Sequence, residues 1–212
     1  MRNENHQHWI SAGLIAFVWF SLLVICLAAL RPEYQHAYKA INELGAIGAP
    51  YMLVMNTFGF IGTGLLMAMF AVGYRSIVGE QVAGYKALLI TALFFALTAL
   101  PIAMLADGDP DRESSYTMVH LVFVMLVPIP WLWAIISIFQ HYRKGPFRAL
   151  AVVSIFAFIV LTALTAYRML GPDSNVPGLW QRASFAVFLG WYAIAAFLLR
   201  SARQSDLQRV AR

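Results

Sequence analysis

Hydrophobic residues of this chain fall in six long blocks, separated by short polar segments. Each block is close to the roughly 20 helical residues that cross a hydrocarbon layer of about 30 Å. None alternates with the period of two expected of a membrane strand. The pattern therefore predicts six transmembrane helices, at about residues 9–30, 50–74, 87–106, 117–140, 149–168 and 179–199.

Composition supports the same fold class. The 212 residues are 61% hydrophobic and 12% charged, and the mean hydropathy is +0.70. Soluble domains have about half apolar and a quarter charged residues, so an ordinary soluble enzyme, a disordered chain and a secreted disulfide scaffold are excluded. We expect an all-α polytopic membrane protein. Residues 1–200 would form one six-helix domain, and residues 201–212 a short basic tail.

Lysine and arginine residues predict the orientation of the helices. With the N-terminus inside, the inner segments carry ten of them and the outer segments five. Cytoplasmic loops are enriched in these residues, so both termini are predicted to be cytoplasmic. This placement accounts for the net charge of +5, and a nucleic-acid partner is not expected.

Three strongly polar residues lie inside predicted spans. Asn56 is nearly two turns into the second span, His120 is about one turn into the fourth, and Arg182, preceded by Gln181, is in the first turn of the sixth. Each has a structural alternative: an interhelical hydrogen bond, packing, or an arginine that reaches lipid phosphates. Each also suits a ligand site, because buried polar groups need partners.

These residues share one level of the predicted bundle with several others. Glu43 ends the first outer loop, Tyr51 belongs to an outer aromatic belt, and Asp107 and Asp109 follow the third span. We therefore predict a polar pocket open to the outer side. Its candidate ligand-binding residues are Glu43, Tyr51, Asn56, Asp107, Asp109, His120, Gln181 and Arg182. Within it, Glu43 is expected to contact a donor from another helix, either Arg182 or a backbone amide.

Short motifs in the same regions resemble the membrane family catalogued as domain of unknown function 998. The specific stretch is Asn42-Glu43-Leu44-Gly45-Ala46-Ile47-Gly48-Ala49-Pro50-Tyr51, followed by Asn56. Asp107-Gly108-Asp109-Pro110, His120 and Gly178-Leu179-Trp180-Gln181-Arg182 agree with it, although the family often has histidine-glycine where this chain has His120-Leu121. The resemblance implies a six-helix, multi-pass protein of the bacterial or archaeal inner (plasma) membrane with no established activity.

Two functions of different classes fit the predicted pocket. The first is binding or transport of a lipid-like amphiphile, with its head group in the pocket and its tail between the third and fourth spans, which Pro101, Pro128 and Pro130 are expected to kink. Membrane lipid is then the expected partner. A structural or assembly role, and a homo-oligomer, remain open alternatives.

The second function is a membrane-embedded hydrolase or transferase acting on lipid head groups. A divalent metal would be held by His120 with Asp107, Asp109 or Glu43, and Arg182 would stabilise an oxyanion. No cofactor is evident, because the chain lacks G-x-x-x-x-G-K-[ST], H-E-x-x-H and C-x-x-C. Only one histidine lies within a predicted span, so the metal is not favoured.

Overall fold

The computed structural model describes residues 4–79, 83–99, 115–170 and 176–210, without the side chains of residues 4–7, 115–117, 169–170 and 203–210. These residues form helices, with no strand among them. In chain order, the elements are η1 (Glu4–Ser11), α1 (Ala12–Ala29), η2 (Ile41–Gly45), α2 (Met52–Val54), η3 (Met55–Ile61), α3 (Gly62–Val78), α4 (Tyr85–Leu97), α5 (Ser115–Leu126), α6 (Pro128–Tyr142), α7 (Arg148–Leu170) and α8 (Pro177–Val210).

Five stretches of this bundle are long and apolar enough to cross a membrane. They are His8–Ala29, Met52–Val78, Met118–Tyr142, Arg148–Arg168 and Pro177–Ala202. Each agrees with a predicted span to within a few residues. The predicted span 87–106 overlaps the shorter apolar helix α4, and its last seven residues lie outside the described residues. The number of six crossings therefore stays a prediction.

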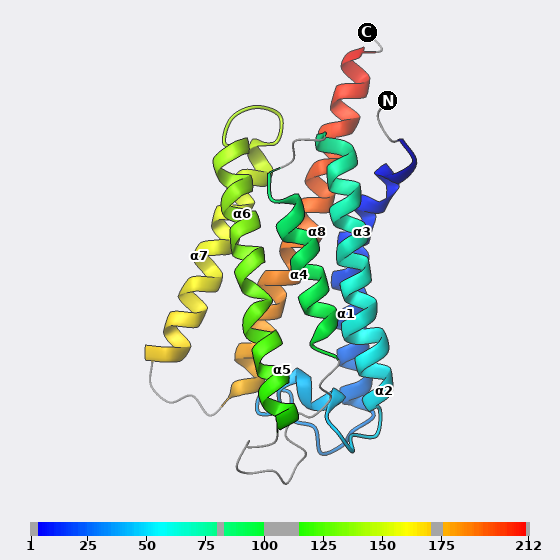
Figure 1. Cartoon of the computed structure of the whole chain (residues 1–212), viewed down its shortest axis with the longest axis vertical. Coiled ribbons are helices and arrows are strands. Elements are labelled where there is room, and N and C mark those ends of the chain that lie inside the picture. The colour runs from blue at the N-terminus through cyan, green and yellow to red at the C-terminus, as the bar shows by residue number, and fades with distance from the viewer. Residues whose placement is uncertain (1–3, 80–82, 100–114, 171–175, 211–212) are drawn as a thin grey trace.

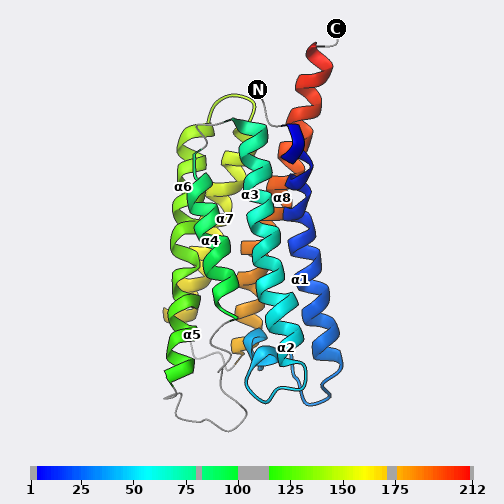
Figure 2. The same ribbon diagram turned by 45° about the vertical axis from the view of Figure 1, so that its right-hand side comes forward.

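The helices form a closed ring at one end of the molecule. Going round it, α1 contacts α3, α3 contacts α4, α4 contacts α6, α6 contacts α7, α7 contacts α8, and α8 returns to α1. The N-terminal η1 and the end of α8 lie at this same end, and η2 and α2 lie at the opposite end (Figures 1 and 2). We call the first the terminal end and the second the cap end. Which of them faces the cytoplasm stays a prediction.

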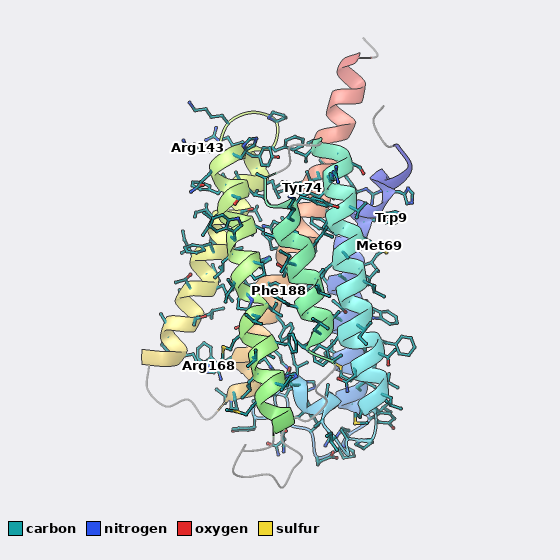
Figure 3. All side chains as sticks on the ribbon, viewed as in Figure 1. Trp9, Met69, Tyr74, Arg143, Arg168 and Phe188 are labelled. Carbon is teal, nitrogen blue, oxygen red and sulfur yellow. The ribbon has the colours of Figure 1, made fainter. Side chains whose placement is uncertain are left out.

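The interior of the ring is filled by aromatic side chains and closed by small residues. Phe188 lies at its centre (Figure 3) and packs against Phe95, Trp131 and Tyr192 with ring centroids 5.2–5.9 Å apart. Where α3 meets α4, a Cβ added at Gly64 would lie 2.8 Å from the Cβ of Ala96. This crossing therefore depends on glycine, as is usual where membrane helices approach closely.

Two helices are locally irregular where the sequence requires it. The fourth span bends at Val127, because Pro128 has no amide hydrogen for the carbonyl of Val124 and instead begins α6. Segment η3 is a π-helix that joins α2 to α3 and contains the buried Asn56. π-helical segments are rare and frequently occur at functional sites. The predicted kink is thus present at Pro128, whereas Pro101 lies outside the described residues.

Candidate ligand-binding site

Residues 30–51, which we call the cap, fold back over one end of the bundle (Figure 1). Its apolar side chains Ile41, Leu44 and Ala46 are 1–3% exposed, and Tyr34 is 6% exposed. Burying these side chains holds the cap against the helix ends, since each large apolar side chain contributes roughly 1.5–3 kcal/mol when buried. The cap is therefore part of the folded core, and the polar residues predicted for the pocket lie around it.

Arg182 makes four hydrogen bonds, three of which connect the start of α8 to the cap. Its Nη1 donates to the carbonyl oxygens of His36 (2.6 Å), Lys39 (3.0 Å) and Gly178 (2.9 Å), and its Nη2 donates to the hydroxyl of Tyr34 (2.9 Å). The guanidinium also lies over the Tyr34 ring, 5.5 Å from its centroid. The partners of Arg182 among the described residues are thus backbone carbonyls and a phenol, and a phosphate or lipid partner for Arg182 stays a prediction.

A glycine makes this close approach feasible. A Cβ added at Gly178 would collide with the carbonyl oxygens of Lys39 and His36, so any side chain would push the cap away from α8. The amide of Leu179 also donates to the carbonyl of Ala37 at 3.1 Å. The start of α8 thus binds the cap by both backbone and side chain.

Tyr34 lies between Arg182 and the cap backbone. Its hydroxyl donates to the carbonyl of Ala40 at 2.7 Å while accepting from Arg182. Burial raises the pKa of the Tyr34 phenol, and the hydrogen bond and positive charge of Arg182 oppose that rise in part. The phenol is consequently neutral at ordinary pH and acts as donor and acceptor together.

Gln181 and Glu43 both satisfy amides at the start of η2. The amide of Ile41 donates to Oε1 of Gln181 at 2.5 Å, and the amide of Ala40 donates to Oε1 of Glu43 at 2.8 Å. The other carboxylate oxygen of Glu43 pairs with Lys39 at 3.3 Å. First-turn amides of a helix lack intrahelical acceptors, so these side chains stabilise the turn. Glu43 thus meets a backbone amide as expected, but in its own segment and not in another helix.

His120 joins the cap to two further elements. Its Nδ1 lies 2.8 Å from the carbonyl oxygen of Thr98 at the end of α4, and its Nε2 lies 3.2 Å from Nδ2 of Asn42 in η2. A carbonyl only accepts hydrogen bonds, so Nδ1 must carry the proton and Nε2 accepts from the Asn42 amide. His120 and Asn42 are 2% and 6% exposed, so this bridge is buried.

Asn56 anchors the far end of the cap to the π-helix. Its Nδ2 donates to the carbonyls of Gly45 and Met52, both at 2.8 Å. A Cβ added at Gly45 would lie 2.9 Å from Oδ1 of Asn56, so glycine is needed for this contact. Tyr51 precedes α2 and is half-buried against the core. Asn56 is thus held by the E-L-G stretch that the sequence singled out.

The eight predicted residues thus separate into those that hold the cap, those outside the described residues, and Tyr51, which is half-buried against the core. Five of them, Glu43, Asn56, His120, Gln181 and Arg182, use their side chains to hold the cap. Asp107 and Asp109 lie outside the described residues. In the described part of the chain, no three His, Cys, Asp or Glu side chains are grouped in a way that could hold a metal ion, and a metal that involves the two aspartates stays a prediction.

Sequence reasoning missed Asn42, Tyr34 and Gly178. Asn42 directly precedes Glu43 in the most specific motif, and Gly178 opens the sixth span, so both had a local signal. Tyr34 had no such signal in the sequence, because its role depends on where the folded cap places its ring. Tyr74, near the end of α3, is also fully buried and donates to the carbonyl of Ala83 at 2.9 Å.

Beside the cap, the bundle is open between α5 and the pair α7 and α8. Helix α5 packs against α4 and α6, and no Cα atom of its described residues lies within 8 Å of a Cα atom of α7 or α8. On α7, no side chain from Phe158 to Arg168 is buried, and on α8 none from Leu179 to Val187 is buried. We call this region, where α5 stands apart from α7 and α8 and no side chain of these two stretches is fully buried, the opening.

Comparison with known proteins places the chain in a family. No curated protein and no solved structure matches it. The model of the family described as "Protein of unknown function (DUF998)" matches residues 14–198, from the first turn of α1 to near the end of the apolar part of α8. This match covers most of the chain and every described element that holds the cap. The protein belongs to the DUF998 family.

Proposed function

We propose that this membrane protein binds a lipid-like amphiphile from the leaflet at the cap end, with the acyl chain in the opening between α5, α7 and α8. The observation that supports this proposal is that the inner stripe of α7 is incompletely buried toward the cap end. Near the terminal end that stripe is buried at Leu150, Ser154 and Ala157, and it continues with helical spacing to Leu161 and Leu164, which are only half-buried. An acyl chain would complete this packing.

Polar groups near the opening suit a head group. Gln181 and Arg182 begin α8 beside the opening. Backbone carbonyls bond to Arg182 without neutralising it, so its charge still attracts an anionic group nearby. Lys39 and Glu43 add one charge of each sign at the cap. Mixed charges favour a zwitterionic or hydroxylated head group, because both signs then find partners.

Cytoplasmic termini and an inner-membrane location are part of the same proposal. They rest on the excess of Lys and Arg in the loops at the terminal end, and they would place the opening in the outer leaflet.

A filling substitution tests the opening directly. Leu161→Trp or Leu164→Trp would occupy the space of the acyl chain, whereas Ile159→Trp, at a side chain 56% exposed on another face of α7, is the matched control. With added phosphatidylethanolamine as the probe, native mass spectrometry should show weaker lipid retention for the two filling variants only. Equal retention in all three variants would contradict the proposal.

The hydrolase alternative has less support. Both ring nitrogens of His120 already have protein partners, so metal binding or proton transfer would first break the bridge to Asn42 or Thr98. Added zinc that stabilised the purified wild-type protein, but not a His120→Gln variant, would favour this alternative over lipid binding.

A further inference from the structure

We infer that the terminal end carries a binding surface for anionic phospholipid head groups, formed by two neighbouring helix hairpins. Its members, which we call the basic corner, are Arg75, Lys86, Arg143, Lys144 and Arg148. All five side chains are exposed. The two hairpins are α3–α4 and α6–α7, and both turn at the terminal end in each view (Figures 1 and 2).

The two hairpins are fixed to each other by close contacts. Gly84, with a φ of +80°, lies so near α6 that an added Cβ would be 2.9 Å from the carbonyl oxygen of Ala134. The buried Tyr74 donates to the carbonyl of Ala83 just before it, and the Tyr142 phenol at the end of α6 lies beside that of Tyr74. The basic corner is therefore carried by a rigid backbone, which lowers the entropic cost of binding.

The α6–α7 connection concentrates the charge. Arg143, Lys144 and Arg148 fall within six residues, and Gly145, with a φ of +91°, allows the tight turn between them. Phe147 packs edge-on against Tyr142 with ring centroids 5.6 Å apart. An aromatic anchor beside clustered cations is the arrangement expected at a lipid–water interface.

Pairing distinguishes these cations from those of the cap. In the cap, Arg31 and Lys39 pair with Glu33 and Glu43, and nearby Arg182 bonds the cap carbonyls. In the basic corner, Arg75 lies over the Tyr85 ring at 5.2 Å, and none of the five cations has a hydrogen bond or ion pair to a described residue.

Acidic side chains do not balance this charge. The acidic side chains that the structure describes, Glu33 and Glu43, both lie in the cap. The sequence adds Glu4, Glu80 and Asp206 in segments of the terminal end, three acids against the ten Lys and Arg residues of the same segments. Topogenic signalling requires positive charge on this side of the membrane, but it does not require cations that lack a described acidic partner on two hairpins packed against each other. A preorganised surface of this kind fits the phosphate groups of an anionic leaflet.

The test compares the two ends of one helix. Arg148 and Arg168 are exposed arginines at opposite ends of α7, so Arg148→Gln is the test variant and Arg168→Gln its matched control. Each cation near an anionic surface contributes about 1 kcal/mol, or about fivefold in affinity. For the full-length protein, titrated with phosphatidylglycerol and followed by native mass spectrometry, we expect about fivefold weaker binding for Arg148→Gln. The triple variant Arg143→Gln, Lys144→Gln and Arg148→Gln should lose about a hundredfold.

Further controls separate the effect of charge from an effect on folding, and binding of lipid from binding of a soluble anion. The double variant Arg143→Lys and Arg148→Lys keeps both charges and should bind phosphatidylglycerol as the wild type does. Phosphatidylcholine and inorganic phosphate should bind weakly in all variants, and phosphatidylglycerol binding should fall with added salt. Equal losses for Arg148→Gln and Arg168→Gln, unchanged binding in the triple variant, or equal binding of inorganic phosphate would each overturn the inference.

Discussion

Replacing Arg182 by lysine tests whether the cap is held by the planar guanidinium or only by a positive charge. An ammonium group retains the charge and can donate from one nitrogen to the carbonyls that Nη1 now contacts. It cannot also reach the Tyr34 hydroxyl that accepts from Nη2 at 2.9 Å. The lost hydrogen bond is worth about 1.5–3 kcal/mol, and the lost cation–π contact about 0.5–1 kcal/mol.

We therefore expect Arg182→Lys to lower the free energy of unfolding by about 2–3 kcal/mol. For a chain of this size, about 2–4 °C per kcal/mol corresponds to a fall in Tm of about 5–10 °C. Thermal unfolding of the purified protein in one detergent, followed by tryptophan fluorescence, measures it directly. Fluorescence is suitable because Trp180 lies on the first turn of α8, two residues before the substitution.

Arg200→Lys is the control. Arg200 is exposed at the terminal end and makes one hydrogen bond, to the hydroxyl of Ser11 at 3.1 Å, so its replacement should change Tm by no more than about 2 °C. Equal and small shifts for both variants would mean that a point charge suffices at Arg182. The description of the cap as held by a guanidinium fork would then be refuted.

Four other results are expected. Gly45→Ala should lower the free energy of unfolding by about 1–3 kcal/mol, because its Cβ would lie 2.9 Å from the Asn56 amide. In a double-mutant cycle with Asn56→Ala, the two losses of stability should be clearly less than additive. Asn42→Ala should lower the free energy of unfolding by about 1–3 kcal/mol, because it leaves Nε2 of His120 buried without a donor; denaturant titration measures this loss. The double variant Asn42→Ala and His120→Phe should recover part of it. The folded-state pKa of Tyr34 is raised, so the contribution of its phenol to stability is complete below the unfolded pKa of about 10 and is lost as the pH rises toward the folded-state pKa. Above about pH 10, the Tm of Tyr34→Phe should therefore fall less steeply with pH than that of the wild type. Reporters fused to the C-terminus and to the α6–α7 connection should read cytoplasmic, and one in the α4–α5 connection should read external; the reverse pattern would invert the topology.

Much of the architecture is determined by hydrophobicity alone. Spans of about 20 apolar residues must be helical in lipid, because every backbone amide and carbonyl has to be satisfied within its own segment. For that reason five predicted spans coincide with five long apolar helices. The bend at Pro128 was predictable for the same kind of local reason, since proline lacks the amide hydrogen that a continuous helix needs.

The sequence also identified the residues that meet at the cap, but not what they do there. Glu43, Asn56, His120, Gln181 and Arg182 share one level of the bundle because each lies a short distance from the same end of a span. Their partners are mostly backbone carbonyls and amides of the cap. Every residue type offers these groups, so the sequence holds no signal for which of them a side chain will reach.

Tertiary structure alone decided the path of the cap and the position of the opening. Gly178 and Gly45 show why the path was hidden: each allows a contact between segments far apart in the sequence, and neither contact follows from local propensity. The opening beside α7 was equally hidden, because Leu161 and Leu164 continue the apolar stripe of the buried Leu150 and Ala157 with the same helical spacing. Periodicity determines which face of α7 turns inward, but only the arrangement of α5 and α8 determines whether another helix covers it.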